Sequence, residues 1–219
     1  MSSQSSHTDR ESETDTLVVY SDIVCPFCYL GRASLRSYLD DAEAPPTVEW
    51  RLFDLRGHKR GPDGEIDETV ADGKDEAYFQ RVRENVDRLR QTYDVAMQSF
   101  DDLPEVDSWD AQQAALYVQQ TADRATFEAF YHATLDAYWR DGADVADPDV
   151  LANVGESVGV DGGEIRAAVT DETLARELEA RFEAARERGI TGIPTFVYDG
   201  HAARGAVPPE HLRRLVGGV

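Results

Sequence analysis

Two cysteines carry the most specific chemical signal in this chain. Cys25 and Cys28 are the only cysteines among its 219 residues. A Cys-x-x-Cys pair can hold a disulfide between its own sulfurs and exchange it with the thiols or disulfides of other molecules. In an intracellular chain, such a pair at the junction of a strand and a helix is typical of redox chemistry. The spacing therefore predicts thiol–disulfide exchange.

The expected start of a helix at these residues explains the chemistry. Backbone amides at a helix N-terminus point toward the first sulfur and stabilise its thiolate, which is the nucleophile. Pro26 suits the first helical turn, because the N–H that it lacks has no helical partner there. The second sulfur lies one turn further along the helix, where it can resolve a mixed disulfide.

Three other uses of two cysteines fit the sequence less well. A zinc site needs about four ligands, and the chain has neither a second Cys-x-x-Cys pair nor histidines at zinc-finger spacing. A structural disulfide that closes so short a loop adds little stability. Two inert buried cysteines would not need a proline at the helix start. We therefore expect no metal and no bound organic cofactor, only the redox-active cysteine pair.

The apolar pattern predicts the elements that position the pair. Residues 16–20 form an apolar, β-branched run that predicts a buried strand, and a helical pattern follows Pro26. Residues 47–53 alternate between polar and apolar and predict a second strand, which completes a β-α-β unit. Apolar residues spaced by three and four then predict helices around residues 79–93, 127–138, 150–158 and 174–185.

Strand character returns near the C-terminus. Residues 193–198 predict a strand, Asp199-Gly200 a hairpin turn, and residues 201–204 a partner strand. Pro194 before a strand is unusual and indicates a turn or a cis peptide bond. A cis bond that faced the cysteines would keep metal away from the thiolate and present the backbone of Ile193 to an extended substrate. The alternative is a trans proline in a simple loop, since few X–Pro bonds are cis.

The charge of the chain excludes several kinds of partner. It has 22 Lys plus Arg against 43 Asp plus Glu, a formal net charge of -21. A surface this negative repels phosphates, so we expect neither nucleic-acid nor membrane binding. No apolar run approaches the roughly 18 residues that a transmembrane helix needs. The dense carboxylate shell favours a salt-loving source, because it keeps a protein hydrated at high salt.

The N-terminal segment has no apolar core. Residues 1–15 are mostly Ser, Thr, Asp, Glu and Gln, without the basic start and apolar stretch of a secretory signal. We therefore expect a disordered tail over residues 1–15 and a cytoplasmic protein.

Several segments together resemble the DsbA family of thioredoxin-fold disulfide oxidoreductases, in particular its FrnE-like branch. These are residues 21–31 with the Cys-Pro-Phe-Cys motif, and residues 50–55, 137–142, 147–151, 189–196 and 205–208. The resemblance implies an α/β, thioredoxin-like fold with a large all-helical insertion. We assign residues 16–60 and 185–219 to the thioredoxin-like domain and residues 61–184 to the helical insertion domain.

The resemblance also implies roles for single residues. Cys25 is the attacking thiol, Cys28 the resolving thiol and Pro194 the cis proline. The residues expected to contact the substrate are Pro26, Phe27, Ile193 and Pro194. Phe27 stands where relatives often carry Trp or His, so we predict no particular reduction potential.

Asp22, three residues before the pair, has two possible roles. It either assists proton transfer to or from Cys28 or caps a turn. The general preference of Asp for turns favours the cap.

The expected substrates are protein or peptide thiols and disulfides, or a small-molecule thiol. One alternative is a non-catalytic, redox-sensing holdase or binding protein whose helical insertion grips its partners. Another is a glutathione-dependent transferase or isomerase of the kappa type, in which Ser commonly stands at the position of Cys25. The sequence predicts neither the direction of exchange nor the oligomeric state.

Overall fold

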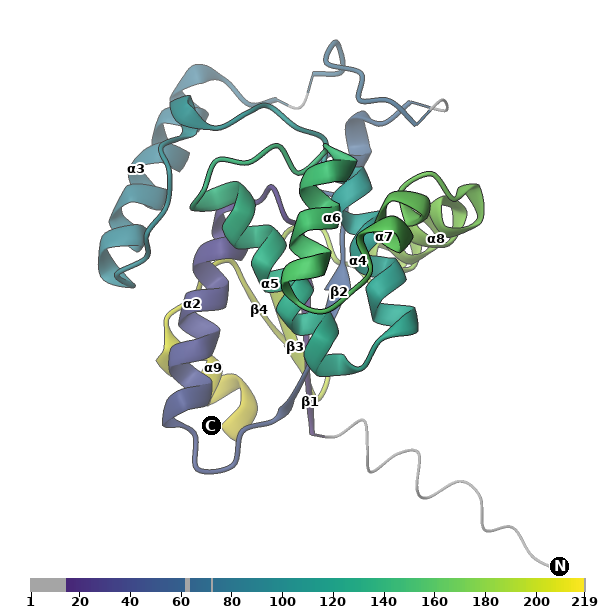
Figure 1. The fold of residues 1–219 in the computed structure, drawn as a ribbon. Helices are drawn as coiled ribbons and strands as arrows, with labels where there is room; N and C mark the ends of the chain where they lie inside the picture. Colours follow the sequence, from purple (N-terminus) through teal and green to yellow (C-terminus); the bar gives the residue numbers. More distant parts are fainter. Residues whose placement is uncertain (1–14, 62–63, 72, 219) are drawn as a thin grey trace, which may run out of the picture.

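A four-stranded sheet forms the centre of the computed structural model, which describes residues 15–61, 64–71 and 73–218 (Figure 1). The strand order is β2-β1-β3-β4. β1 and β2 are parallel, while β3 runs antiparallel to both β1 and β4. The bounds are β1 Thr16–Ser21, β2 Thr47–Leu52, β3 Thr195–Tyr198 and β4 His201–Arg204. All but one residue of the predicted tail lies outside the described residues.

The predicted β-α-β unit is present, with α2 over Pro26–Asp41 as its crossover. β1 alternates its side chains between the two faces of the sheet. Leu17 and Val19 enter the main core, whereas Tyr20 joins a smaller cluster that holds both cysteines. β3 begins two residues later than predicted, at Thr195, because Pro194 has no N–H to give to a strand ladder.

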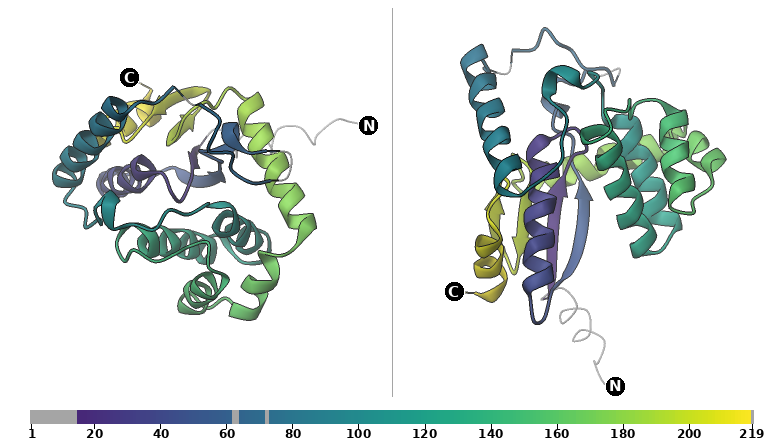
Figure 2. Two further views of the ribbon diagram at one scale, coloured as in Figure 1. Left: turned by 90° about the horizontal axis from the view of Figure 1, so that it is seen from above. Right: turned by 60° about the vertical axis from the view of Figure 1, so that its left-hand side comes forward.

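Helices fill the described chain between β2 and β3, and one more closes it (Figures 1 and 2). The short 3-10 turns are η1 Gly57–Lys59 and η2 Phe100–Asp102. The α-helices are α3 Glu76–Thr92, α4 Trp109–Thr121, α5 Arg124–Trp139, α6 Pro148–Ser157, α7 Gly162–Ala168, α8 Glu172–Glu187 and α9 Pro209–Gly217. The boundaries of the insertion domain stay a prediction, and α8 runs across the later one.

The inserted helices share one core with the sheet. Tyr131 and Trp139 of α5 are fully buried. The Trp139 indole N–H donates to the Ile23 carbonyl at 2.7 Å, and the Tyr131 hydroxyl lies 2.8 Å from the Ser21 hydroxyl. Both bonds end on the segment that leads from β1 to the cysteines. The insertion therefore braces the segment that carries the predicted redox pair.

α3 is the exception to this packing. Its second half is buried through Val86 and Leu89, as the predicted apolar stripe requires. The predicted stripe does not reach the core at Phe79, which is 43% exposed, although Val82 one turn later packs against the core. Figure 2 shows the first half of α3 rising beyond the end of the sheet at which α2 begins.

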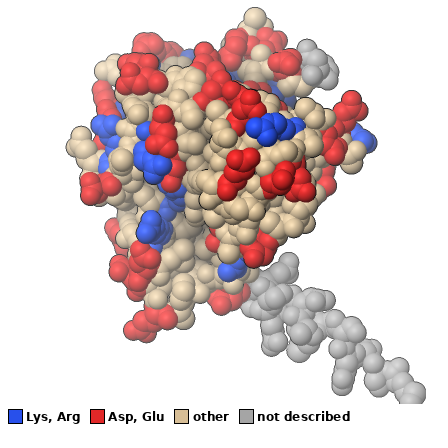
Figure 3. All heavy atoms as spheres, viewed as in Figure 1, with Lys and Arg blue, Asp and Glu red and all other residues tan. Residues whose placement is uncertain are grey.

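On the face of the molecule seen in Figure 3, acidic side chains cover more of the surface than Lys and Arg do. Within the described residues, no helix combines the length and apolar character needed to cross a membrane.

Candidate active site

Cys25 and Cys28 lie where β1 ends and α2 begins. Cys25 has an extended backbone and occupies the N-cap position, with Pro26 in the first turn. The Cys25 carbonyl accepts hydrogen bonds from the Cys28 N–H at 3.0 Å and the Tyr29 N–H at 3.2 Å, which start the helix. Both thiols are free, and the two residues are only 2% and 1% exposed.

Pro194 lies beside the pair. The Ile193–Pro194 peptide bond is cis. The Cys25 sulfur lies 3.8 Å from the Ile193 carbonyl oxygen, so the thiol can donate to it. Gly31 makes the approach of α2 possible, since a Cβ at this position would lie 3.0 Å from the Pro194 ring. Two segments that are distant in the sequence thus meet at one sulfur.

The two thiols differ in their surroundings. Burial raises the pKa of the Cys28 thiol well above its usual value, and the neighbouring Cys25 acts in the same direction. Hydrogen bonds from the Asp22 N–H and the Ser21 hydroxyl oppose this shift without cancelling it. Cys28 therefore resists ionisation while both thiols are reduced.

Asp22 lies completely buried below this pair. One carboxylate oxygen accepts from the Leu55 N–H at 2.8 Å, and the other accepts from the Val24 N–H at 3.3 Å. The Ser108 hydroxyl donates a further bond. Burial raises the pKa of Asp22 from 3.8 to about 6, because these bonds do not compensate for lost water, and the charge of Asp54 raises the pKa further. Asp22 therefore caps the turn before Cys25 and can also change its protonation near neutral pH.

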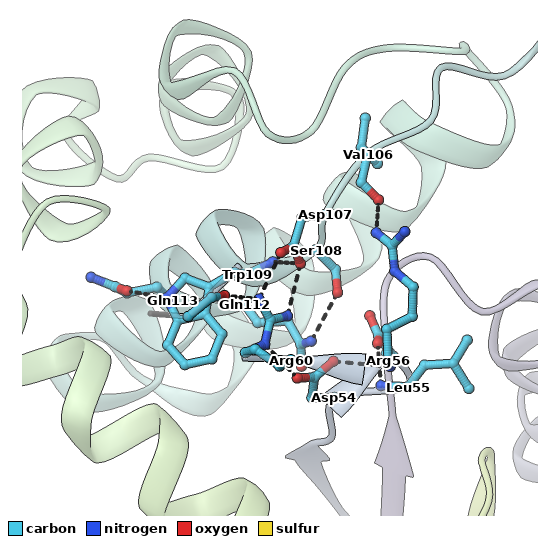
Figure 4. A network of polar contacts seen from close by, with 12 residues as sticks. Asp54, Leu55, Arg56, Arg60, Val106, Asp107, Ser108, Trp109, Gln112 and Gln113 are labelled. Atoms are coloured by element: carbon cyan, nitrogen blue, oxygen red, sulfur yellow. Dashed lines mark hydrogen bonds and ion pairs between the residues drawn. The ribbon is translucent and has the colours of Figure 1, made fainter. Parts of the chain in front are cut away.

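A polar network surrounds Ser108 (Figure 4). The Arg60 guanidinium lies 2.9 Å from the carboxylate of Asp54, which is buried, and 2.7 Å from the carboxylate of Asp107, which is partly exposed. It also stacks over the Trp109 ring at 4.7 Å. These contacts join the loop after β2 to the start of α4, and so hold Ser108 against Asp22.

Gln112 completes the surroundings of Ser108. Its side-chain amide donates to the Ser108 hydroxyl oxygen at 3.1 Å, which leaves the Ser108 proton for Asp22. Gln112 is 1% exposed, and its carbonyl oxygen finds no partner among the described residues. Local sequence patterns do not indicate this network, because its members come from two loops and one helix.

Residues 16–217 match the family of the DSBA-like thioredoxin domain. The chain belongs to this family. The match covers the sheet, the cysteine pair and every described α-helix. It therefore treats the helical insertion as part of the DSBA-like domain.

Proteins similar to this DSBA-like chain come from several bacteria. The uncharacterized protein YwbO of Bacillus subtilis is 24% identical over 211 residues, which is 90% of this chain and 94% of that protein. A crystal structure of a probable DsbA oxidoreductase, SCO1869 from Streptomyces coelicolor, has 25% identity and a TM-score of 0.74, with 93% and 90% of the two chains covered. The cytosolic disulfide reductase DsbM of Pseudomonas aeruginosa shares the fold at 20% identity and a TM-score of 0.61, with 92% of each chain covered.

The predicted site residues differ in how deeply they are buried in this DSBA-like chain. Cys25, Cys28 and Ile193 belong to one buried cluster. Phe27 is half-buried and packs against both this cluster and the main core. Pro26 is also half-buried, at the first turn of α2.

Proposed function

We propose that this chain is a thiol–disulfide oxidoreductase that acts on protein or peptide substrates. The observation that carries the proposal is the position of the Cys25 sulfur, at the N-terminus of α2 and 3.8 Å from the Ile193 carbonyl. The Ile193 backbone lies next to the attacking sulfur, where it can pair with an extended substrate. Membership of the DSBA-like family supports this use of the pair.

The reduced pair acts in two displacement steps. The Cys25 thiolate attacks one sulfur of a substrate disulfide, forms a mixed disulfide and releases the other sulfur as a thiolate. The Cys28 thiolate then attacks the Cys25 sulfur, and the second substrate sulfur leaves. The substrate gains two electrons, Cys25 and Cys28 lose them as their disulfide forms, and each substrate thiolate takes up a proton. Oxidation of a substrate dithiol is the reverse reaction.

Cys28 must lose its proton in the second step, and we assign Asp22 as the acceptor. Burial holds the pKa of Asp22 at about 6, so the carboxylate is available as a base at neutral pH. The Asp22 N–H bonds to the Cys28 sulfur, which places the same residue beside the thiol that must ionise. The alternative is that Asp22 only caps the turn, which its bonds to Val24 and Leu55 already do.

Substrate access requires a local movement. Cys25 is 2% exposed, and it shares its cluster with Tyr20, Phe53, Ile190 and Ile193. A substrate sulfur reaches the thiolate only after some of these side chains shift. We therefore expect iodoacetamide to alkylate Cys25 more slowly than a free cysteine at the same pH.

Two cysteine variants test the proposal. Cys25→Ser removes the nucleophile and should abolish exchange, whereas Cys28→Ser should trap substrate as a mixed disulfide on Cys25. Both are compared with the wild-type protein for insulin reduction and for trapped adducts. A Cys25→Ser protein that keeps exchange activity overturns the proposal. Unchanged suppression of aggregation by Cys25→Ser, without any exchange by the wild type, would establish the holdase instead.

A small thiol is a second candidate substrate. The reductase DsbM has also been solved with GSH, and the same Cys25 pair could react with glutathione disulfide. Glutathione conjugation without disulfide exchange would favour the transferase or isomerase alternative. We further propose that the protein works without metal or organic cofactor, in the cytoplasm, in the FrnE-like branch and in a salt-loving source.

A further inference from the structure

We propose that a groove beside Phe27 binds acidic side chains of a peptide substrate through Arg88 and Arg204. The groove lies between α2, α3 and the loop that leads from β4 to α9. The inference rests on the proposed exchange function and adds a substrate preference to it. The bound segment is the stretch of peptide next to the reacting disulfide.

The groove lies beside the Cys-Pro-Phe-Cys motif. It measures about 710 Å³, within the usual range for ligand sites, and Phe27 from the Cys-Pro-Phe-Cys motif lines it. The opposite wall is the loop at Gly205, whose N–H donates to the Pro194 carbonyl at 2.8 Å. A peptide that pairs with the Ile193 backbone therefore lies next to this opening.

The walls of the groove are tied together. The hydroxyl of Tyr93, which caps the C-terminus of α3, donates to the Ala206 carbonyl at 3.0 Å, and the Ser34 hydroxyl of α2 donates to the Val207 carbonyl at 2.5 Å. Leu89 forms a buried apolar part of the α3 wall. The structure thus holds the groove open by bonds within the protein.

Two arginines at this groove lack a carboxylate partner. Most described arginines form ion pairs, as Arg32 does with Asp136 and Arg124 with Glu128. Arg88 instead bonds to the amide oxygen of Asn85 at 2.6 Å, and Arg204 has no ion pair with any described residue. Both side chains are exposed and both line the groove.

Arg88 and Arg204 belong to the minority of described arginines without an ion pair, which also includes Arg81 and Arg214. Acidic residues outnumber basic ones, 43 to 22, so most cations find a carboxylate. A guanidinium presents paired donors that match a carboxylate, which makes an unpaired arginine a ready acceptor of an acidic side chain from outside. The pair also offsets, at short range, the repulsion that the net charge of -21 exerts on an acidic peptide.

One acidic residue, Glu210, also lines the groove. The groove therefore holds two cations and one anion, and it stays positive relative to the rest of the surface. Glu210 repels acidic peptides, so Glu210→Gln should strengthen the preference that Arg88 and Arg204 create.

Matched peptide disulfides test this inference. Three peptides carry the same disulfide flanked by Glu, by Gln or by Lys, and kcat/KM is measured for each with the reduced full-length protein. The wild type should prefer Glu over Gln and Gln over Lys. The double variant Arg88→Gln/Arg204→Gln should lose about fivefold on the Glu peptide, the size expected for two exposed charge pairs, and less than twofold on the Gln peptide.

A matched control separates a local site from a general charge effect. Arg81→Gln/Arg214→Gln removes the same charge from two exposed arginines outside the groove, neither of which has an ion pair with a described residue. An equal loss in this control, or no preference for Glu in the wild type, overturns the inference. The inference is also overturned if Arg88→Gln/Arg204→Gln loses kcat/KM on glutathione disulfide but not on the Glu peptide. If the wild type reduces no peptide at all, the proposed function fails instead.

Discussion

Two buried carboxylates lie close together in this protein and have opposite surroundings. Asp54 is 4% exposed and has a cation, Arg60, at 2.9 Å. Asp22 is fully buried and has only N–H and hydroxyl donors. The Leu55 N–H that bonds to Asp22 comes from the residue directly after Asp54.

The difference separates a carboxylate that is paired with a cation from one whose proton can be exchanged. The effect of Arg60 on a pKa is seen at Asp107, its second carboxylate partner. Burial acts to raise the pKa of Asp107, but hydrogen bonds and charge from Arg60 outweigh it and lower the pKa below its usual value. Among the described residues no cation lowers the pKa of Asp22, so burial dominates, the charge of Asp54 adds to it, and the pKa rises to about 6. Arg60 therefore anchors the insertion, while the Asp22 carboxyl next to the cysteines exchanges its proton near pH 6.

The largest effect is expected when the cation is removed. Arg60→Met leaves Asp54 buried without its partner, so the free energy of unfolding at pH 7 should fall by about 3–5 kcal/mol. Urea unfolding measures this loss. Arg60→Met/Asp54→Asn should recover most of the stability, because no unpaired charge stays buried. If Arg60→Met lowers the free energy of unfolding no more than the substitution of an exposed arginine does, the Arg60–Asp54 pair does not stabilise the fold.

Asp22→Asn should have the opposite effect and raise the free energy of unfolding. Because the folded-state pKa of about 6 lies above the usual 3.8, the native protein binds this proton more tightly than the unfolded chain does. The resulting destabilisation is absent below pH 3.8 and grows until pH 6, so the variant should gain on the order of 1–3 kcal/mol at pH 8 and nothing at pH 3.5.

Urea unfolding at both pH values measures this difference for Asp22→Asn. The variant should also slow exchange above pH 6, if Asp22 accepts the Cys28 proton. An equal change in stability at both pH values would contradict the shifted pKa, and an unchanged exchange rate would leave Asp22 with the cap alone.

Ser108→Ala should produce a smaller change in stability that is visible mainly as a shift in the pKa of Asp22. It removes a hydrogen bond that lowers the pKa of Asp22, so that pKa should rise further, with a loss of stability of about 1 kcal/mol. Carbon-detected NMR titration of the Asp22 carboxyl measures the shift. Ser108→Thr keeps the hydroxyl and serves as the control. A pKa that stays the same in Ser108→Ala would remove Ser108 from the account.

The smallest effect is expected at an exposed pair of the same length. Arg140 lies 2.9 Å from Asp141, as Arg60 does from Asp54, but both side chains are 52% exposed. Arg140→Gln should change the free energy of unfolding by less than about 1 kcal/mol, and the change should vanish in high salt. A loss equal to that of Arg60→Met would show that distance, rather than burial, decides the strength of these pairs.

Local patterns predicted the parts of the fold that depend on neighbouring residues. The β-α-β unit and the helix start at Pro26 follow from short apolar runs and one proline. α4 gave no stripe, because its buried residues lie all around the helix, from Ala111 to Val118. The stripe at Phe79 failed for the opposite reason, since a stripe does not say whether another element covers it.

Motifs in the sequence predicted candidate site residues, but not what surrounds them. The spacing of the two cysteines and their place between a strand and a helix predicted the pair, but nothing in the sequence predicted the partners of Asp22. Leu55 and Ser108 reach it from other elements, and only the folded chain brings them there. The Arg60 network could not be predicted either, because ion pairs between loops leave no periodic pattern in the sequence.

The strand order also has a consequence for synthesis of the protein on the ribosome. β1 lies between β2 and β3, but β3 ends only at Tyr198. Until that residue emerges, one edge of β1 has no partner, and a two-stranded sheet is marginally stable by itself. The helices of the insertion must therefore appear before the sheet can close. The candidate redox site, in which Ile193 lies beside Cys25, is assembled only after the segment that leads into β3 has been made.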